Sequence, residues 1–193
     1  MRTRKGWETI TTRGYHHGNL RRVIIDAAVE AIAESGTTTW SLRELARRAG
    51  VSHAAPAHHF GDKTGLFTAI AAEGYALFAD ALAEAGDDFL EVGVAYVRFA
   101  VGHRGYFEVM FRPDLYRSDD PEVVRARKVA DGILWRGAGT LSDEPSQDAA
   151  AIGAWSLVHG FAELWLSGNL SGDFQGAPDA AARTVISALF DRQ

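Results

Sequence analysis

The chain has 193 residues, of which 47% are hydrophobic, 23% charged and 10% aromatic, a composition that indicates a folded globular protein and excludes a low-complexity chain. It has no cysteine, which excludes disulfides, thiolate metal sites and cysteine nucleophiles. The net charge of -5 is unevenly spread, because residues 1–63 carry ten Lys/Arg against six Asp/Glu and residues 64–193 carry ten against nineteen.

A basic front and an acidic back are typical of a polyanion-binding head joined to a separate body, although chance variation over so few charges gives the same imbalance. No segment approaches the ~18 consecutive apolar residues of a membrane span, and the first residues lack the apolar core of a signal peptide. We therefore expect a cytoplasmic protein without a membrane partner.

The first predicted helix starts near residue 20. Its apolar residues follow the i, i+3, i+4, i+7 spacing of an amphipathic helix, and they are Leu20, Val23, Ile24, Ala27, Ala28, Ala31 and Ile32. Asn19 is a candidate N-cap, and Gly36 is a candidate end.

The segment SLRELARRAG predicts a second helix that ends at Gly50. Ser41 and Glu44 form a capping-box pattern, in which each side chain accepts a hydrogen bond from the other residue's backbone N–H. After a turn of about three residues, Ser52 is a candidate cap for a third, short helix. Two short helices joined by a tight glycine-containing turn predict a helix-turn-helix unit.

Pro56 falls near the start of this third helix. With Ser52 as the cap, Pro56 is the fourth helical residue and distorts the first turn. With the cap at Ala54 or Ala55, the missing N–H of Pro56 costs little. The sequence leaves both registers open.

From residue 62 onward, the hydrophobic spacing predicts only helices, over 62–85, 87–103, 104–111, 120–141, 144–168 and 179–191. No alternating strand pattern with hairpin turns occurs. We expect an all-α fold of about nine helices, divided into a basic N-terminal arm (1–18), a three-helix helix-turn-helix domain (19–65) and a larger helical domain for ligand binding and dimerisation (66–193).

Histidines in the segment AGVSHAAPAHHF raise the question of a metal site. A helical zinc pair needs histidines three or four residues apart, whereas His58 and His59 are neighbours and His53 lies five residues before His58. Glycine-rich phosphate loops and a nucleophile motif are absent. We expect no metal, no cofactor and no enzymatic activity.

The same segment fits a helix that reads DNA. Its short or polar side chains would let the helix backbone approach the major groove, and Lys63 and Arg43 would hold phosphates. A solvated polar surface without a partner fits the spacing equally well.

The residues also resemble a known family, the tetracycline-repressor (TetR) type of bacterial transcription regulators. The resemblance rests on YHHGNLRRVIIDAAVEAIAESG, SLRELARRAGVS and HHFGDKTGLFTAIAAEG in the front part. In the back part, AWSLVHGFAELWLSG resembles a C-terminal subtype named for a Trp-His-Gly signature, here Trp155, His159 and Gly160.

The resemblance implies a homodimeric repressor that binds a palindromic double-stranded DNA operator and is released by a small-molecule inducer. Phe60 would hold the short third helix to the core. Many members carry a tyrosine where this chain has Ala57, and His58, His59 or the arm could replace the phosphate contact of that tyrosine. The expected DNA-binding residues are Ser41, Arg43, Ser52, His53, Ala54, Ala57, His58, His59 and Lys63.

The arm carries most of the remaining basic charge of the front part. It could enter a minor groove, or it could be a disordered tail. Its basic residues, with two from the first helix, are Arg2, Arg4, Lys5, Arg13, Arg21 and Arg22.

Wide apolar faces on the last two helices indicate a four-helix dimer interface, although either face could pack only within its own subunit. The expected interface residues are Leu157, Phe161, Leu164, Trp165, Val185, Ile186, Leu189 and Phe190. The remaining aromatic residues could line a pocket for a largely apolar ligand, with His159 as its polar contact, or they could be ordinary core. These pocket residues are Tyr96, Phe99, Phe107, Met110, Phe111, Trp135, Trp155 and His159. A dimeric DNA-binding or interaction module without ligand sensing is the alternative function.

Overall fold

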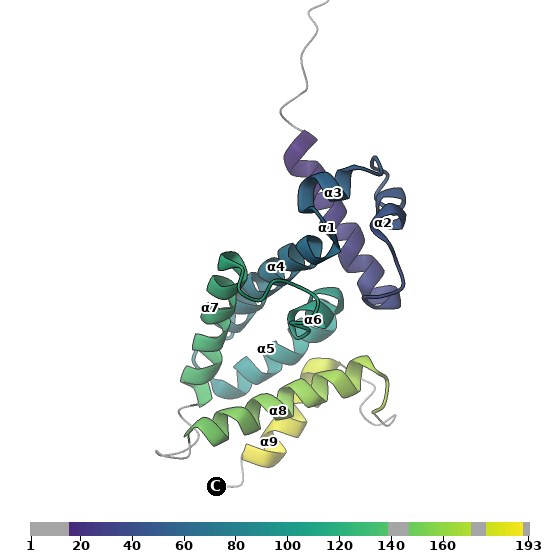
Figure 1. The fold of residues 1–193 in the computed structure, drawn as a ribbon. Coiled ribbons are helices and arrows are strands. Elements are labelled where there is room, and N and C mark those ends of the chain that lie inside the picture. The colour runs from purple at the N-terminus through teal and green to yellow at the C-terminus, as the bar shows by residue number, and fades with distance from the viewer. Residues whose placement is uncertain (1–15, 139–146, 171–176, 191–193) are drawn as a thin grey trace, which may run out of the picture.

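Helices make up nearly all of the described structure, a computed structural model that covers residues 16–138, 147–170 and 177–190 (Figure 1). This part of the chain contains no strand, and the predicted all-α fold is confirmed. The helices are α1 (His16–Ser35), α2 (Leu42–Arg48), α3 (Ala55–Phe60), α4 (Lys63–Glu84), α5 (Phe89–Gly102), α6 (Arg104–Met110), α7 (Pro121–Ala138), α8 (Gln147–Leu166) and α9 (Pro178–Phe190). The predicted arm falls almost wholly outside the described residues.

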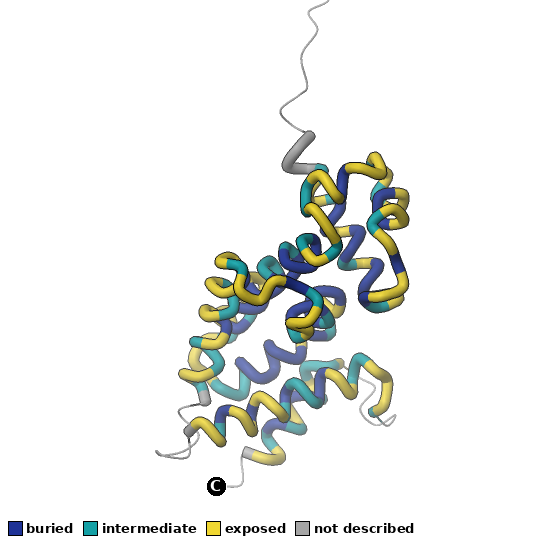
Figure 2. Tube along the Cα trace, in the orientation of Figure 1, coloured by how far each residue is buried: buried dark blue, intermediate teal, exposed yellow. Residues whose placement is uncertain are grey.

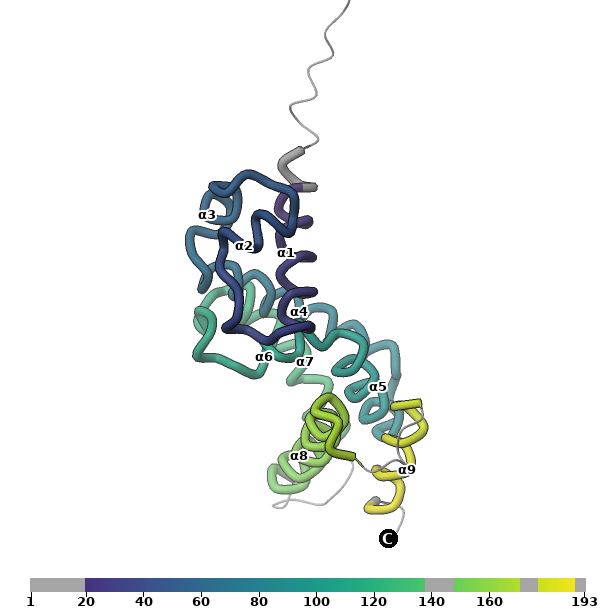
Figure 3. The backbone as a smooth tube through the Cα atoms, turned by 90° about the vertical axis from the view of Figure 1, so that its right-hand side faces the viewer, coloured from purple at the N-terminus to yellow at the C-terminus, as the bar shows by residue number. Residues whose placement is uncertain are grey.

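The first three helices form a small head (Figures 1 and 3). Helix α1 starts at His16, so the predicted cap Asn19 lies inside the helix and that prediction is wrong. The apolar stripe does face the core, where Ile24 and Ile32 of α1 are fully buried together with Leu45 of α2. The indole of Trp40, in the loop before α2, closes this core and donates to the Gly36 carbonyl at 3.1 Å.

Two glycines allow the sharp turns after α2 and after α3. Gly50, in the turn between α2 and α3, has a φ of 66°, and Gly61, directly after α3, has a φ of 77°. A residue with a Cβ atom is strained at these angles, so glycine is the residue that lets the chain turn sharply at both points. The predicted end of α2 at Gly50 therefore agrees with the structure to within two residues.

Helix α4 runs from the head into the body and packs there against α6 and α7 (Figures 1 and 3). Helix α5 lies at the centre of the body and is buried along most of its length, as Figure 2 shows. Helices α8 and α9 pack on the far side of α5 and show exposed residues along their outer faces (Figure 2).

Among the described residues, two helices are long and apolar enough to cross a membrane by length and composition, α4 and the part of α8 from residue 148. In α4, 56% of the most apolar window is buried among other helices, as in a core helix of a soluble protein. The outer face of α8 is largely exposed, so its apolar character calls for a separate explanation.

Head and body meet at a close contact between α1 and α6. A Cβ atom on Gly105 would lie 2.2 Å from the carbonyl oxygen of Val29, so only glycine lets the two backbones approach so closely. Beside this contact, the Arg22 guanidinium binds the Glu73 carboxylate of α4 and donates to the Tyr106 hydroxyl of α6 at 2.9 Å. Burial and the bond to Glu73 raise the pKa of Tyr106 to about 12, so the phenol stays protonated and donates to Glu73 at 2.6 Å.

Candidate functional site

Helix α3 presents a polar face to solvent and an apolar face to the head. Ala55 and Pro56 are buried against α1 and α2, and Phe60 is partly buried on the same core, as predicted. The residues predicted to reach DNA from this segment lie on the other side, with His59 half-buried and the rest exposed: Ser52, His53, Ala54, Ala57, His58 and His59.

The structure resolves the register of Pro56. Ala54 flanks the first helical residue, Ala55, and makes no side-chain cap. Pro56 is thus the second helical residue, where no intrahelical N–H bond is lost. Of the caps that the sequence left open, the structure has Ala54, and the Ser52 carbonyl accepts the Ala55 N–H at 3.0 Å in the turn that precedes the helix.

Helix α2 packs against α3 and contributes its own polar residues. The Ser41 hydroxyl accepts the Glu44 N–H at 3.2 Å, which confirms Ser41 as the N-cap. The Glu44 carboxylate binds Arg47 at 2.5 and 3.1 Å. Glu44 therefore supplies an ion pair on the surface of α2 in place of the second half of the predicted capping box.

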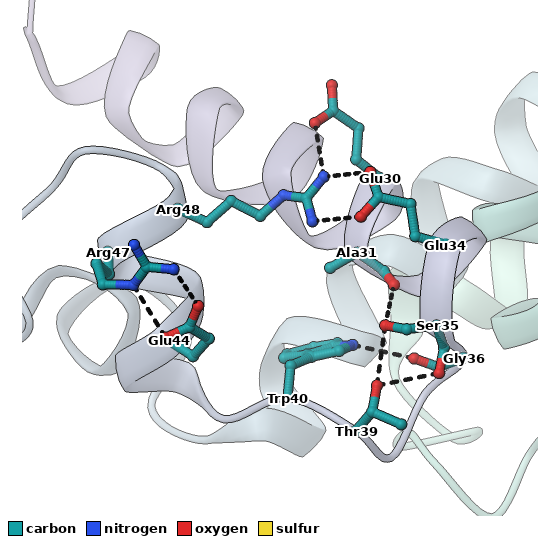
Figure 4. A network of polar contacts seen from close by, with 10 residues as sticks. All are labelled: Glu30, Ala31, Glu34, Ser35, Gly36, Thr39, Trp40, Glu44, Arg47 and Arg48. Atoms are coloured by element: carbon teal, nitrogen blue, oxygen red, sulfur yellow. Dashed lines mark hydrogen bonds and ion pairs between the residues drawn. The ribbon is translucent and has the colours of Figure 1, made fainter.

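The three arginines of α2 differ in their ion pairs, and Figure 4 shows the pairs of Arg47 and Arg48. Arg48 reaches across to α1, where its guanidinium binds Glu34 at 2.6 Å and Glu30 at 3.5 Å. Arg47 pairs with Glu44. Arg43 is exposed, and within the described part of the chain it makes no ion pair. Of the three, Arg43 alone keeps all its donors available for a phosphate or a base.

Lys63 stands at the start of α4 and turns toward the head. Its ammonium donates to the Trp40 carbonyl at 3.0 Å and lies 4.1 Å from the centre of the Trp40 ring. Burial lowers the pKa of Lys63 from its usual value. An ammonium has three donors, so two remain for a phosphate while the third holds Trp40.

The two histidines of α3 are neighbours in space as well as in sequence. The rings of His58 and His59 pack edge to face, with their centres 5.4 Å apart. In the described ranges no group of three or more His, Cys, Asp or Glu side chains is placed to hold a metal ion.

A cavity of about 490 Å³ lies in the body between α4, α7, α8 and the segment that follows α6. Four of the eight predicted pocket residues line it, namely Met110, Phe111, Trp135 and Trp155. The sequence reasoning missed other lining residues from helices far apart in the chain, including Tyr75, Phe78, Tyr116, Arg127, Asp131 and Leu134. The spacing of Tyr75 and Phe78 on one face of α4 is the one signal for these residues that the sequence offers.

The other four predicted pocket residues lie behind the cavity wall. Phe99 and Phe107 are buried in the core, and Tyr96 is fully buried but reaches a small adjacent space. His159 packs against Phe111, with ring centres 4.7 Å apart, and does not line the large cavity. These four residues therefore belong to the same aromatic cluster as Phe111 and Trp155, which line the cavity.

A chain of hydrogen bonds runs through this cluster. The Trp155 indole donates to the Tyr96 oxygen at 3.1 Å, and the Tyr96 hydroxyl lies 2.9 Å from Nδ1 of His159. The Tyr96 hydroxyl donates to His159 when Nδ1 carries no proton, that is, when the neutral ring has its proton on Nε2. Burial favours this form, because it lowers the pKa of His159 and raises the pKa of Tyr96. His159 thus uses Nδ1 to hold Tyr96.

The predicted dimer residues of α8 and α9 lie partly on the outer faces of these helices and partly in the core of the subunit. In the single chain, Leu164 is 46% and Leu189 63% exposed, whereas Phe161 and Ile186 are buried in the subunit's own core. Leu157, Trp165 and Val185 are half-buried. The side chain of Phe190 lies outside the described residues.

Comparison with known proteins matches both parts of the chain to one family. Residues 24–70 match the model described as bacterial regulatory proteins, tetR family, and residues 89–189 match the model described as tetracyclin repressor-like, C-terminal domain. The chain is 30% identical to the HTH-type transcriptional regulator BetI of Escherichia coli over 169 residues, which cover 79% of this chain and 83% of BetI.

Solved structures show the same fold over nearly the whole chain. A protein of unknown function from Rhodococcus sp. RHA1 is 32% identical, with a TM-score of 0.72 and coverage of 92% of this chain and 96% of that chain. A bacterial regulatory protein in the tetR family from the same strain is 23% identical, with a TM-score of 0.68 and coverage of 88% and 95%. With family models matched in both head and body, the chain belongs to the TetR family of DNA-binding bacterial transcriptional regulators.

Proposed function

We propose that the protein is a cytoplasmic, homodimeric repressor that binds a palindromic operator and is released when a small, largely apolar ligand enters the body. The observation that carries this proposal is the polar face of α3, which is exposed while Ala55 and Pro56 anchor the helix to the head. A short helix held in this way can enter the major groove with its side chains toward the base edges.

Charge supports the placement of the DNA on this face. Arg43 is exposed on α2 and makes no ion pair among the described residues. The acidic residues Glu34 and Glu44 are already bound to Arg48 and Arg47. The free guanidinium is therefore placed to bind a phosphate and fix the register of α3 in the groove.

Dimerisation would cover the exposed apolar faces of α8 and α9. Leu164 and Leu189 are large apolar side chains left open in the single chain, and a Cβ on Gly153 or Gly160 would meet nothing within 4 Å. Exposed leucines beside glycines suit the close approach of a second copy of the chain. Such a dimer would explain why the apolar surface of α8 is mainly exposed in the single chain.

A gel shift with the DNA upstream of the coding sequence tests operator binding. The wild type should shift one fragment, and Arg43→Gln should weaken binding and reduce the salt slope by roughly one phosphate contact. Arg112→Gln is the matched control, since it removes the same charge from an exposed pair with Asp114 in the body. Equal weakening in both variants would refute a specific role for Arg43.

Sedimentation tests the dimer with the double variant Leu164→Glu and Leu189→Glu, which should yield monomers with unchanged helix content. An unchanged dimer would refute the assignment of this interface. Release of the DNA by a bound ligand separates the proposed sensor from a DNA-binding module that senses nothing.

A further inference from the structure

The large cavity has two charged lining residues, Arg127 and Asp131, both on α7. They are four residues apart, which places them on one side of the helix with Cβ atoms about 5–6 Å apart. Among the described residues, neither makes a hydrogen bond or an ion pair. An i,i+4 ion pair in a helix is weaker when the basic residue precedes the acidic one, as Arg127 precedes Asp131. This order is consistent with the absence of an ion pair between them.

The other polar groups around the cavity already have partners. Tyr75 and Tyr116 both donate to the Met110 carbonyl at 2.8 Å. The Trp155 indole donates to Tyr96. The remaining lining is mainly aromatic or aliphatic, so the two charges of α7 are the groups that a ligand would have to satisfy.

We propose that the ligand is a zwitterion of the α-amino acid class with a large apolar side chain, an inference that rests on the proposed function of a ligand-released repressor. Its carboxylate binds Arg127 and its ammonium binds Asp131. Both groups of an α-amino acid are attached to one carbon, so they can meet a cation and an acid placed one helical turn apart.

A ligand with one charge fits this pair less well. A carboxylate alone would be attracted to Arg127 but would bring a like charge toward Asp131. An amine alone would be attracted to Asp131 and repelled by Arg127. Burial raises the pKa of Asp131, and the charge of Arg127 opposes that rise; a ligand ammonium would act in the same direction as Arg127 and favour the carboxylate.

The apolar part of the ligand has a defined direction. From Arg127 to Trp135, α7 spans about 12 Å, and Trp135 lines the cavity together with Ile152 and Trp155 of α8. Arg127 and Asp131 precede Trp135 along the helix and are close enough to Tyr75 to act on its pKa. A large apolar side chain would therefore extend along α7 toward the two tryptophans.

Isothermal titration calorimetry on the full-length protein tests the proposal with three indole compounds that differ in their charged groups. L-tryptophan should bind about tenfold more tightly than 3-indolepropionate, which lacks the amine, and tryptamine, which lacks the carboxylate. Asp131→Asn should remove the preference over 3-indolepropionate, and Arg127→Gln the preference over tryptamine.

Arg125→Gln is the matched control, because it removes the same charge from the same helix but outside this cavity, and it should keep the full preference. Equal binding of the three compounds, or tighter binding of either singly charged compound, overturns the proposal. So does the absence of heat with L-tryptophan, L-phenylalanine and L-leucine at about 10 mM. If a variant misfolds by circular dichroism, the three-compound comparison on the wild type decides alone.

A gel shift on the same preparation separates this proposal from the function on which it rests. Wild-type protein that shifts the upstream DNA but binds no amino acid refutes only the ligand class. Wild-type protein that binds no upstream DNA refutes the repressor function, whatever the calorimeter records.

Discussion

Replacing Gly65 with alanine should destabilise the protein at the junction between the DNA-reading helix and the body. A Cβ atom at residue 65 would lie 1.9 Å from the carbonyl oxygen of Phe60 and 3.2 Å from the guanidinium of Arg117. Phe60 is the last residue of α3, and Gly65 lies in the first turn of α4. Because the nearer atom belongs to the backbone, no side-chain rotation relieves the clash, and α3 must move away from α4.

The size of the effect is a difference between two contributions. Overpacking of this kind costs about 1–3 kcal/mol. Alanine in place of glycine gains about 1 kcal/mol of helix propensity. The net loss should be at most about 2 kcal/mol, which for a chain of this length lowers Tm by up to roughly 8 °C. Operator binding should also weaken below Tm, since the exposed face of α3 is displaced.

Gly132→Ala is the matched control, because Gly132 lies inside α7 and a Cβ there would meet nothing within 4 Å. This variant should gain about 0.5–1 kcal/mol, with a Tm about 1–4 °C above the wild type. Thermal unfolding followed by circular dichroism measures both variants. A Gly65→Ala protein as stable as Gly132→Ala would refute the close approach of Phe60 and Gly65.

Deleting residues 2–13 should weaken operator binding and lower the salt slope by about 0.9 for each phosphate that the arm no longer neutralises, and an unchanged slope in a salt titration would discard a role for the arm. Arg48→Gln, which breaks only the exposed ion pairs with Glu34 and Glu30, should leave operator binding close to that of the wild type in a gel shift, in contrast to Arg43→Gln. The stability of the wild type should fall as the pH drops below 6.5, because burial lowers the pKa of His159 in the folded state and the unfolded chain then binds the extra proton. In His159→Gln this acid-side loss should shrink in urea unfolding at pH 7.5 and 5.5, and an equal loss in both proteins would contradict the buried, neutral imidazole.

Local patterns predicted the helices well. The apolar stripe of α1, the cap at Ser41 and the Asp120–Pro121 start of α7 depend on residues no more than a few positions apart, and the structure confirms each of them. The error at Asn19 and the open choice of cap before α3 both concern helix starts, where several residues compete to satisfy the same few backbone groups.

The candidate site was only half predictable for the same reason. The exposed side of α3 follows from its own sequence, but the difference between Arg43 and Arg48 depends on acids of α1 that lie 14 and 18 residues away. His159 looked like a free polar contact until the fold brought Tyr96, 63 positions earlier, within hydrogen-bond distance.

The sequence by itself determined that the chain is helical, with a helix-turn-helix head near its start that resembles those of a regulator family. These properties depend on periodicity and motifs that involve residues close together in the sequence. Tertiary structure alone decided which charges are free and which are paired, and it assembled the cavity from Tyr75, Arg127 and Trp155 on three separate helices. Whether a polar group is available to a ligand depends on which neighbours packing brings to it, and no local pattern records those neighbours.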